Sequence, residues 1–456
     1  MKVKVILAIA VCKALRLVSR LLHRGGTAMP GRYALKICPQ LLSVLARNVQ
    51  TVAITGTNGK TTGARMIEEA FAGQGKSYFA NRSGANLIDG ITTEFVVNSS
   101  LTGKNRCDYA VIECDEAASV KVFRQLQPKV IVVTNLFRDQ LDRFGDLSHT
   151  RDSIKTAIAS VPGATLCLNA DCSITSSLAE ELPNKVLYFG IDKGAVPTKA
   201  KSELSDGCIC IRCGHEYEFD YINFGHLGGF SCPNCGHSRP KADFAVVDIA
   251  GQTMQGSTLV MDMQGEKRMV TVNLPAIYNV YNAAAAAAAI TAMGLDPDSA
   301  VKALADFKCG FGRMEEFDIG AGARMMLVKN PTGCNLVMEF LGNVKERFSL
   351  VISLNDRTGD GKDISWIWDA DFEQLGALAG RLQRVTVCGD RAEDMLLRLK
   401  YAGLDEGCMV LERNYEKLVE NMKKESLPCF IMPTYSAMLD IRQVLVKHCG
   451  GSDFWD

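Results

Sequence analysis

The residues best suited to chemistry in this chain form one short run, which follows a strand-like segment (51–54) and precedes a helix-like one (64–72). In that setting glycines let backbone N–H groups surround an anion, and the helix N-terminus adds the positive end of its dipole. A lysine then reaches the terminal phosphates and the next hydroxyl holds Mg²⁺. The run therefore predicts a nucleotide-binding loop, made of Gly56, Thr57, Asn58, Gly59, Lys60, Thr61 and Thr62.

The loop is shorter than a strict Walker sequence, which would place a glycine where Ile54 stands. The alternative interpretation is a Gly/Thr turn with a solvated lysine. The order of strand, loop and helix favours the nucleotide site.

Length and composition limit the number of domains, the class of protein and the kind of partner. A chain of 456 residues is too long for one core, so about three domains are expected. The hydrophobic content of 47% and charged content of 22% are typical of a soluble globular protein. A formal net charge of zero gives no electrostatic reason to expect nucleic acid as a partner. Seventeen irregularly spaced cysteines indicate reduced thiols in the cytoplasm.

The N-terminal segment contains an apolar run from Val3 to Val11, but Lys13, Arg16 and Arg20 interrupt its continuation. This pattern fits neither an exported signal peptide nor a bilayer-spanning helix. Helical spacing of apolar residues instead predicts an amphipathic helix with a basic face. Those residues are Leu7, Val11, Leu15, Val18 and Leu22. The helix either packs on the body of the protein or attaches loosely to the inner membrane face.

Strands and helices alternate after the loop, which predicts a doubly wound parallel sheet. The strand-like segments 108–113 and 129–134 end in polar residues, and such ends line the ligand crevice of these sheets. Glu113 is therefore a candidate Mg²⁺ ligand, with a solvated strand-end acid as the alternative. The polar segment 134–143 is expected to place some side chains near the metal or the phosphates.

Four cysteines predict a structural zinc site. Cys210 and Cys213 form one Cys-x-x-Cys-Gly sequence, and Cys232 and Cys235 form the second. Two such pairs are typical of a zinc ribbon with four thiolate ligands. Cys208 and the nearby His215, His226 and His237 are weaker candidates. Ribbons often bind nucleic acid, but Glu216, Glu218 and Asp220 make this segment locally acidic, so a structural insertion is the favoured interpretation.

Several of these motifs together resemble the Mur ligase family over roughly residues 50–335. They are Gly-Thr-Asn-Gly-Lys-Thr, Glu113, Thr-Asn-x-x-x-Asp-x-Leu-Asp at 134–142, Tyr278-Asn279-x-x-Asn282, Gly312-Arg313-x-Glu315 and Lys329-Asn330-Pro331. The resemblance implies phosphorylation of a substrate carboxylate by ATP and attack of an amine on the acyl phosphate. It also implies that Lys60 and Thr61 hold phosphates and Mg²⁺, Glu113 holds Mg²⁺, Asn282 contacts adenine and Arg313 reaches the phosphates.

The chain departs from the amino-acid-adding members at two places. Gln140 replaces a metal-site histidine, and Met326 and Lys329 replace a ribose-binding aspartate and a histidine. These departures and the cysteine pairs resemble the ligase subunits of lipid II isoglutaminyl synthases within the family.

A second, smaller α/β domain is expected from Arg324 onward, with strands at 325–328, 349–354, 385–388 and 430–432. Its acidic loop, 355–369, contains Asp-Gly-x-Asp-x-Ser-Trp-Ile-Trp-Asp and resembles a motif of the same ligase subunits. The resemblance implies contact with a glutamine amidotransferase subunit and an aspartate acting near its cysteine and histidine. Asp360 is the first candidate and Asp363 the second. The alternative is a loop whose acids cap backbone and form local salt bridges.

The sequence thus predicts an α/β protein with three parts. Residues 1–48 form an N-terminal helix and lead-in, and 49–318 form a Mur ligase-type P-loop ATPase domain with a parallel sheet and a zinc ribbon at about 205–240. Residues 319–456 form a smaller Rossmann-like α/β domain that contacts the glutaminase. The implied function is ATP-dependent amidation of D-glutamate in lipid II, with Mg²⁺ and Zn²⁺ bound, at the cytoplasmic side. A self-sufficient Mur or folate-type ligase and a non-enzymatic ribbon protein are the alternatives.

Overall fold

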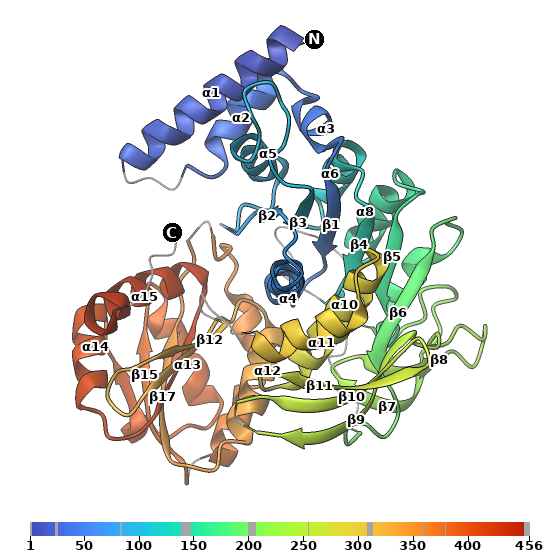
Figure 1. Ribbon diagram of the computed structural model, residues 1–456. Helices are drawn as coiled ribbons and strands as arrows, with labels where there is room; N and C mark the ends of the chain where they lie inside the picture. Colours follow the sequence, from blue (N-terminus) through green and yellow to red (C-terminus); the bar gives the residue numbers. More distant parts are fainter. Residues whose placement is uncertain are drawn as a thin grey trace. The chain divides into compact units, whose positions relative to one another are not determined.

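The computed structural model describes residues 2–22, 26–82, 84–137, 147–198, 207–253, 255–307, 313–357, 359–378 and 380–450 (Figure 1). The chain divides into two compact units. One comprises the described residues up to 137 and from 147 to 307, and the other comprises the described residues from 313 onward.

A nine-stranded sheet forms the centre of the first unit, in the order β11-β10-β9-β6-β5-β4-β1-β3-β2. Neighbouring strands from β2 to β9 pair in parallel, and β10 and β11 add an antiparallel edge. The strands are β1 Gln50–Thr55, β2 Tyr78–Ala80, β3 Tyr109–Glu113, β4 Val130–Val133, β5 Thr165–Asn169, β6 Val186–Ile191, β9 Phe244–Gln252, β10 Ser257–Met263 and β11 Glu266–Val272.

Strand β1 lies between β3 and β4, so the strand order reverses at its carboxyl end. Such a switch point leaves a crevice, because the connections from the neighbouring strands leave in opposite directions. The sequence prediction of a parallel sheet with a loop at this position is confirmed, and the ends of β3 and β4 flank the loop after β1.

Helix α10 packs closely on β4, β5, β6 and α4. Its seven consecutive alanines, 283–289, are all buried, and their small side chains permit this close approach. The helices of the unit are α1 Lys2–Leu21, α2 Met29–Ile37, α3 Leu41–Ala46, α4 Lys60–Gly73, α5 Ile88–Val97, α6 Ser119–Leu126, α8 Leu147–Ala159, α9 Ser173–Ser176, η1 Ser177–Ala179, α10 Ile277–Ala292 and α11 Pro297–Asp306.

A small antiparallel sheet of β7 (Glu218–Phe224) and β8 (Leu227–Ser231) lies between β6 and β9 in the sequence. The buried carboxylate of Asp171 connects it to the main sheet. Asp171 accepts hydrogen bonds from Arg239 Nε at 2.7 Å, Tyr281 Oη at 2.6 Å and Asn223 Nδ2 at 3.3 Å. These three donors come from the segment after β8, from α10 and from β7, so one side chain joins three elements.

The second unit contains a six-stranded sheet in the order β12-β13-β17-β14-β15-β16. Its strands are β12 Arg313–Phe317, β13 Ala323–Met326, β14 Phe348–Ser353, β15 Leu382–Cys388, β16 Met409–Leu411 and β17 Cys429–Pro433. Its helices are α12 Pro331–Gly342, η2 Ser365–Trp368, η3 Phe372–Leu378, α13 Ala392–Tyr401, η4 Glu406–Cys408, α14 Tyr415–Lys424 and α15 Tyr435–Cys449. The four strands predicted in this part of the sequence are present. Strand β12, within the range predicted for the central domain, pairs with β13 of this unit.

The predicted N-terminal helix is present as α1, and one of its faces packs on α2 and α5. Its buried residues are Val5, Ala8, Ile9, Cys12 and Ser19, whereas Leu7 and Val18 of the predicted stripe are exposed. The predicted stripe therefore does not form the face packed on the protein. Within the described residues, no helix combines the length and apolarity needed to cross a membrane.

The Asp171–Arg239 ion pair yields a prediction about stability. Arg239→Met should lower the free energy of unfolding by about 3 kcal/mol or more, because it leaves a buried carboxylate without its cation. Urea denaturation measures the change. Arg212→Met is the matched control, since Arg212 pairs with Glu180 in a more exposed position and should cost at most about 1 kcal/mol. Equal small losses for both variants would contradict the prediction.

Candidate functional site

The loop between β1 and α4 has a backbone that glycine permits. Gly56 and Gly59 have φ angles of 121° and 87°, and Gly59 is the residue that caps α4. A Cβ atom on Gly56 would overlap the side chain of Thr134. These two glycines let the chain turn sharply into the helix, so that the N-terminal end of α4 adjoins the loop.

Lys60 is folded back over this loop. Its side chain is buried, and its ammonium group donates to the carbonyl oxygen of Gly56 and lies 2.7 Å from Glu116 Oε1. Glu116 is itself buried and follows β3. The pair holds the lysine charge at the loop, where anionic phosphates would be stabilised.

The two predicted Mg²⁺ ligands lie side by side. Thr61 Oγ1 donates a hydrogen bond of 2.8 Å to Glu113 Oε2. Asn81 fixes Glu113 by donating to its carbonyl oxygen at 2.8 Å and accepting from its N–H at 2.9 Å. A hydroxyl and a carboxylate beside a phosphate loop are the oxygen donors that Mg²⁺ prefers, so these residues fit the ion.

The segment after β4 fixes the loop through hydrogen bonds to Thr57 and Asn58. Asn58 N donates to Asn135 Oδ1 at 3.0 Å, and Thr134 Oγ1 donates to Asn58 O at 2.7 Å. The Thr57 hydroxyl donates to Phe137 O at 3.1 Å and accepts from Phe137 N at 3.0 Å. The Thr57 side chain therefore holds the loop in place. The rest of the polar segment, Arg138 to Arg143 with Gln140, lies outside the described residues.

Asn282 lies against the loop from α10. A Cβ atom on Gly59 would overlap its side-chain oxygen, while its Nδ2 donates to Asn279 Oδ1 at 3.3 Å. Helix α10 begins at Ile277, so Asn282 lies in the second turn of the helix. Its amide borders the loop, where a nucleotide would bind.

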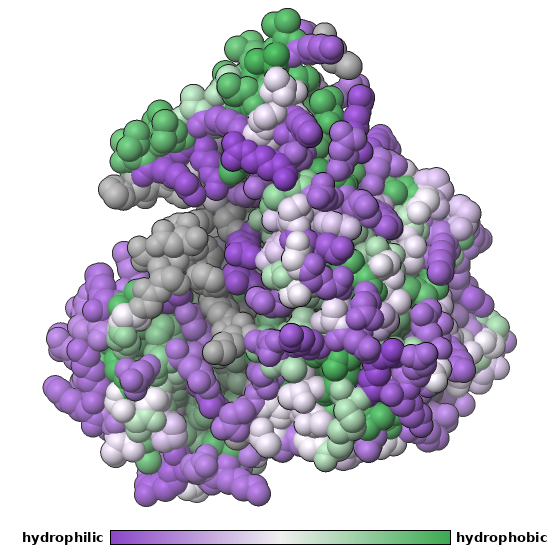
Figure 2. Space-filling view, viewed as in Figure 1, coloured by the Kyte–Doolittle hydropathy of each residue, from purple (hydrophilic) through white to green (hydrophobic). Residues whose placement is uncertain are grey.

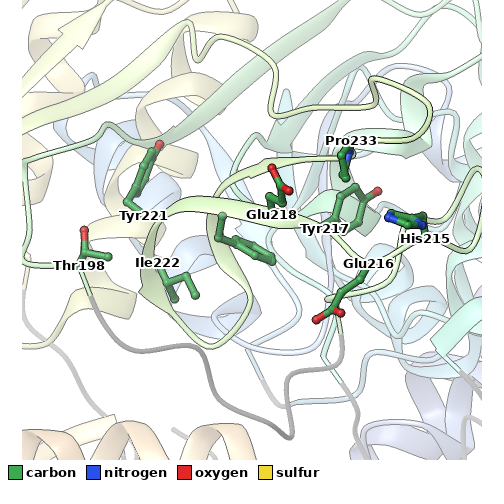
Figure 3. A pocket seen from close by; sticks show the side chains of 9 residues that line it. Thr198, His215, Glu216, Tyr217, Glu218, Tyr221, Ile222 and Pro233 are labelled. Atoms are coloured by element: carbon green, nitrogen blue, oxygen red, sulfur yellow. The ribbon is translucent and has the colours of Figure 1, made fainter.

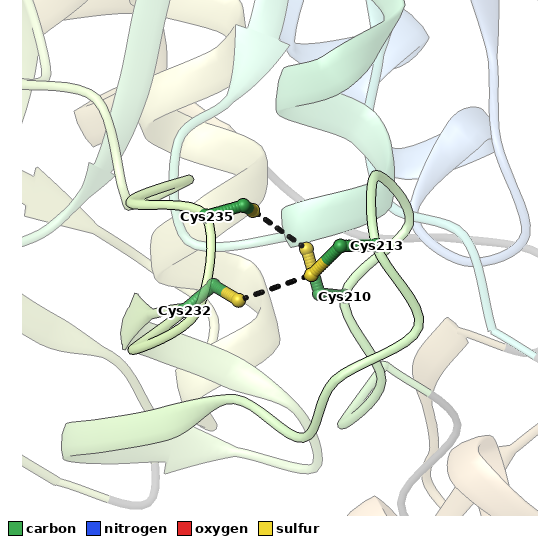
Figure 4. Close-up of side chains that lie close together, drawn as sticks. All are labelled: Cys210, Cys213, Cys232 and Cys235. Atoms are coloured by element: carbon green, nitrogen blue, oxygen red, sulfur yellow. Dashed lines mark hydrogen bonds between the residues drawn. The ribbon is translucent and has the colours of Figure 1, made fainter.

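The four predicted cysteine ligands converge. Their sulfur atoms all lie within 4.8 Å of one another, with Cys210 Sγ 3.5 Å from Cys235 Sγ and Cys213 Sγ 3.5 Å from Cys232 Sγ (Figure 4). Sulfur atoms around a tetrahedral zinc are separated by roughly 3.8 Å, as follows from a Zn–S bond of about 2.3 Å. The cluster fits zinc.

Backbone turns of the same form hold the two cysteine pairs. Gly214 N donates to Cys210 O, and Gly236 N donates to Cys232 O, with φ angles near 74° and 73° at the glycines. A hydrogen bond from the Asn234 side chain lowers the pKa of the Cys213 thiol to about 6. This favours the thiolate, which is the form that binds metal.

The neighbouring histidines have other contacts. His237 Nδ1 lies 2.6 Å from the Tyr217 hydroxyl, and His226 is fully buried. Burial lowers the pKa of His226 to about 4, so its ring is neutral at pH 7. Cys208 is not part of the cluster.

An open pocket of about 560 Å³ lies beside the cysteine cluster (Figure 3). His215, Tyr217 and Tyr221 line it together with Glu216 and Glu218. Two acids on the lining make it unfavourable for nucleic-acid phosphates.

The candidate carboxylates of the second unit differ in exposure. Asp360 is 5% exposed, and it accepts hydrogen bonds from Ser436 N at 2.7 Å, from Ser436 Oγ and from Arg357 N at 3.2 Å. Asp363 is only partly buried and accepts from Ser365 N at 2.8 Å, which begins the Ser-Trp-Ile-Trp turn. Asp360 thus joins the loop to the start of α15, and Asp363 is more accessible.

Other motif residues of this unit have structural contacts. Glu315 forms a nearly buried ion pair with Arg442 at 2.9 Å, and Asn330 caps α12 by accepting from Gly333 N at 2.7 Å. Lys329 directly precedes that cap. Arg313 begins β12, and its side chain lies outside the described part.

Three polar residues important to these arrangements were not identified from the sequence: Glu116, Asn81 and Asp171. Glu116 carried a usable signal, because Asp115 and Glu116 follow a buried strand in the same way as Glu113. Asn81 and Asp171 carried none, since their partners are distant in the sequence.

Comparison with family models gives two matches. Residues 54–235 match the Mur ligase middle domain, and residues 327–438 match the MurT ligase C-terminal domain. The chain is 33% identical to the lipid II isoglutaminyl synthase (glutamine-hydrolyzing) subunit MurT of Streptococcus pneumoniae over 98% of both chains. It is 31% identical to the subunit of the same name from Staphylococcus aureus, over 97% of this chain and 98% of that protein.

Solved structures with the same fold include a pseudomurein peptide ligase type C from Methanothermus fervidus, with a TM-score of 0.65 and 20% identity over 88% of this chain and 79% of that one. MurF from Acinetobacter baumannii has a TM-score of 0.66 and 16% identity, over 92% and 80% of the two chains. Folylpolyglutamate synthase from Mycobacterium tuberculosis has a TM-score of 0.63 and 15% identity, over 97% and 99%.

The loop geometry predicts the effect of Gly59→Ala. The substitution should weaken ATP binding at least about tenfold, because a left-handed φ costs roughly 1–2 kcal/mol and the new Cβ would displace Asn282. Calorimetric titration with a non-hydrolysable ATP analogue measures the affinity. Gly73→Ala is the control, because a Cβ there has no atom within 4 Å. Wild-type affinity of Gly59→Ala would refute the assigned loop.

The cysteine cluster predicts one zinc per chain in protein purified without chelator. Cys213→Ser should lose most of the zinc and lower Tm by roughly 5 °C or more, because metal binding contributes folding free energy. Elemental analysis and thermal unfolding measure both effects. Cys208→Ser, two residues outside the cluster, should keep its zinc. Metal-free wild-type protein would disprove the site.

Proposed function

The chain belongs to the family of MurT subunits of lipid II isoglutaminyl synthases, and on this premise we propose that it amidates the α-carboxyl group of D-glutamate in the lipid II stem peptide. The product is D-isoglutamine. The chain covers nearly the full length of its curated relatives, so the proposal concerns the whole ligase subunit.

The proposed reaction has two steps. A carboxylate oxygen of the substrate attacks the γ-phosphorus of ATP, and ADP leaves, which gives an acyl phosphate. Ammonia then attacks the carbonyl carbon, the C–O bond to phosphate breaks, and the nitrogen loses a proton to give the amide. Positioning and charge stabilisation account for most of the catalysis in such reactions.

The contact that carries the proposal is the Thr61–Glu113 hydrogen bond at the N-terminus of α4, with Lys60 beside it. Thr61 and Glu113 would hold Mg²⁺, which neutralises charge on the phosphates when bound. Lys60 exchanges its contact with the Gly56 carbonyl for phosphate oxygens, and Glu116 positions its ammonium group. Arg313 is proposed to reach the same phosphates, and Asn282 the adenine.

A separate source of ammonia is part of the proposal. Cys172 Sγ lies 3.5 Å from His226 Nε2, but both side chains are completely buried. Burial raises the pKa of Cys172 and lowers that of His226, so neither the thiolate nor the imidazolium is favoured. This pair does not fit a glutaminase centre, which needs a thiolate accessible to glutamine. We propose a glutamine amidotransferase subunit as the source.

The surface near the acidic loop supports a protein partner. Arg398 donates to Ile367 O at 2.9 Å and to Ala370 O at 2.8 Å, which fixes the Ser-Trp-Ile-Trp turn. Trp368 is 50% exposed and contacts Tyr401, with ring centroids 5.7 Å apart. Large exposed aromatic side chains on a fixed turn are typical anchors of protein interfaces.

ATP hydrolysis distinguishes this function from its alternatives. The proposed subunit should show full turnover only with lipid II, the amidotransferase subunit and glutamine. A self-sufficient Mur or folate-type ligase would turn over with an amino acid and no partner. A ribbon-type binding protein would not hydrolyse ATP at all.

The acidic loop predicts a glutamine-specific defect. In the complex, Asp363→Asn should lower glutamine-dependent amidation by about 10²-fold or more, the range for loss of a group that assists proton transfer or orients one that does. Ammonium chloride should restore the rate, because free ammonia bypasses the glutaminase. Mass spectrometry of the amidated stem peptide measures both rates.

Asp360→Asn is the companion variant. Because Asp360 is enclosed by its own chain, this change should also lower Tm, whereas Asp363→Asn should not. A defect in Asp363→Asn that ammonium does not restore would assign the residue to the ligase reaction. Unchanged glutamine-dependent rates in both variants would refute a catalytic role for the loop.

A further inference from the structure

Helix α1 presents a second apolar face that its packing on the protein leaves uncovered. The face is made of residues at helical spacing on the side opposite the buried residues: Val3, Ile6, Leu7, Ala10, Ala14, Leu17, Val18 and Leu21. The large side chains among them have exposed fractions from 44% for Ile6 to 79% for Val3. The stripe extends about 27 Å along the helix, at 1.5 Å per residue. Figure 2 shows hydrophobic residues, in green, along α1.

The opposite side of α1 is firmly attached. Val5 and Ile9 pack beside Gly103, and Arg16 forms an ion pair of 3.2 Å with Glu94. Lys13 donates to the carbonyl oxygen of Ser99. The helix also contacts α2 and α5. The outer stripe is therefore held in a fixed orientation, and its exposure does not result from a detached helix.

All the charged residues of α1 are basic. Exposed Lys2 and Arg20 border it on one side, and exposed Lys4 lies on the other. The first 50 residues contain nine Lys and Arg and no Asp or Glu, although the whole chain has a net charge of zero. Exposed apolar residues flanked by basic residues of the same helix complement a surface that is apolar within and anionic outside.

We propose that the outer face of α1 binds the surface of a membrane containing anionic phospholipid. The helix lies in the interfacial plane, because no described helix is long and apolar enough to cross a bilayer. Leucine and valine side chains enter the acyl boundary, and Lys2, Lys4 and Arg20 contact lipid phosphates. The proposal concerns where the protein binds, so it goes beyond the amidation proposed above and does not depend on ATP.

Vesicle flotation with the full chain, without nucleotide or substrate, tests the proposal. The vesicles contain equal parts of phosphatidylglycerol and phosphatidylcholine, or phosphatidylcholine alone. Wild-type protein should bind the anionic vesicles at least about tenfold more strongly, and added salt should weaken the binding. Absence of binding to both kinds of vesicle would overturn the proposal, and so would equal binding to both.

Substitutions assign the binding to α1. Leu17→Gln with Leu21→Gln should lower the partition coefficient about tenfold or more without changing net charge, because two apolar side chains no longer enter the membrane. Both positions are exposed, so Tm should stay at the wild-type value. Met269→Gln, at an exposed apolar position of β11, is the matched control and should bind normally.

A second set of substitutions tests the basic residues. Sedimentation tests whether a second copy of the chain, and not a membrane, covers the outer face of α1. Lys2→Gln with Lys4→Gln and Arg20→Gln should remove the preference for anionic vesicles. Unchanged binding of both multiple variants would overturn the assignment to α1. The wild type could instead bind no vesicles and sediment as a dimer, with the Leu17→Gln and Leu21→Gln variant sedimenting as a monomer. That result would show that the face joins two copies of the chain, and the proposal would be wrong.

Discussion

The loop between β1 and α4 depends on contacts with the segment that follows β4. A loop with two left-handed glycines has little conformational preference of its own, and the free energy that fixes it must come from its neighbours. Thr134 and Asn135 supply it, because they bind both the N–H and the carbonyl group of Asn58. This requires β4 next to β1, so the strand order of the sheet determines whether the loop can form.

The same strand order places the charged groups. Glu113 ends β3 on the other side of β1, within hydrogen-bond distance of Thr61, and Glu116 follows three residues later to meet Lys60. The acids and the lysine are on different elements, which sets their separation by the sheet geometry and not by local chain flexibility. Little reorganisation of the protein is then needed when phosphates enter.

Much of this arrangement could be predicted from the sequence because its signals are local. A buried apolar run followed by Gly-Thr-Asn-Gly-Lys-Thr determines strand, loop and helix, and each Cys-x-x-Cys-Gly sequence forms its own turn. The Asp171 contacts could not be predicted, since the donors at 223, 239 and 281 are far from it in the sequence and only the fold brings them together. The inner face of α1 was missed for a related reason. That helix is apolar on two sides, and helical spacing alone cannot tell which side packs on the protein.

The sequence also shows two similar acids, Asp360 and Asp363. Only the structure separates them, because Asp360 is buried and accepts hydrogen bonds from Ser436 and Arg357.

Two consecutive residues of α10 connect the cysteine-rich segment with the loop. Tyr281 binds Asp171, which also holds Arg239 and Asn223 beside the ribbon, and Asn282 lies against Gly59. Helix α10 thus contacts both Asp171, beside the cysteine-rich segment, and Gly59 of the loop. Linkage requires that a ligand stabilising one arrangement of that helix shift affinity at the other place by the same factor. If the cysteine cluster holds zinc and the loop holds a nucleotide, as proposed, loss of the metal by thiolate oxidation or chelation is expected to reduce nucleotide affinity, and bound nucleotide to slow the loss of the metal.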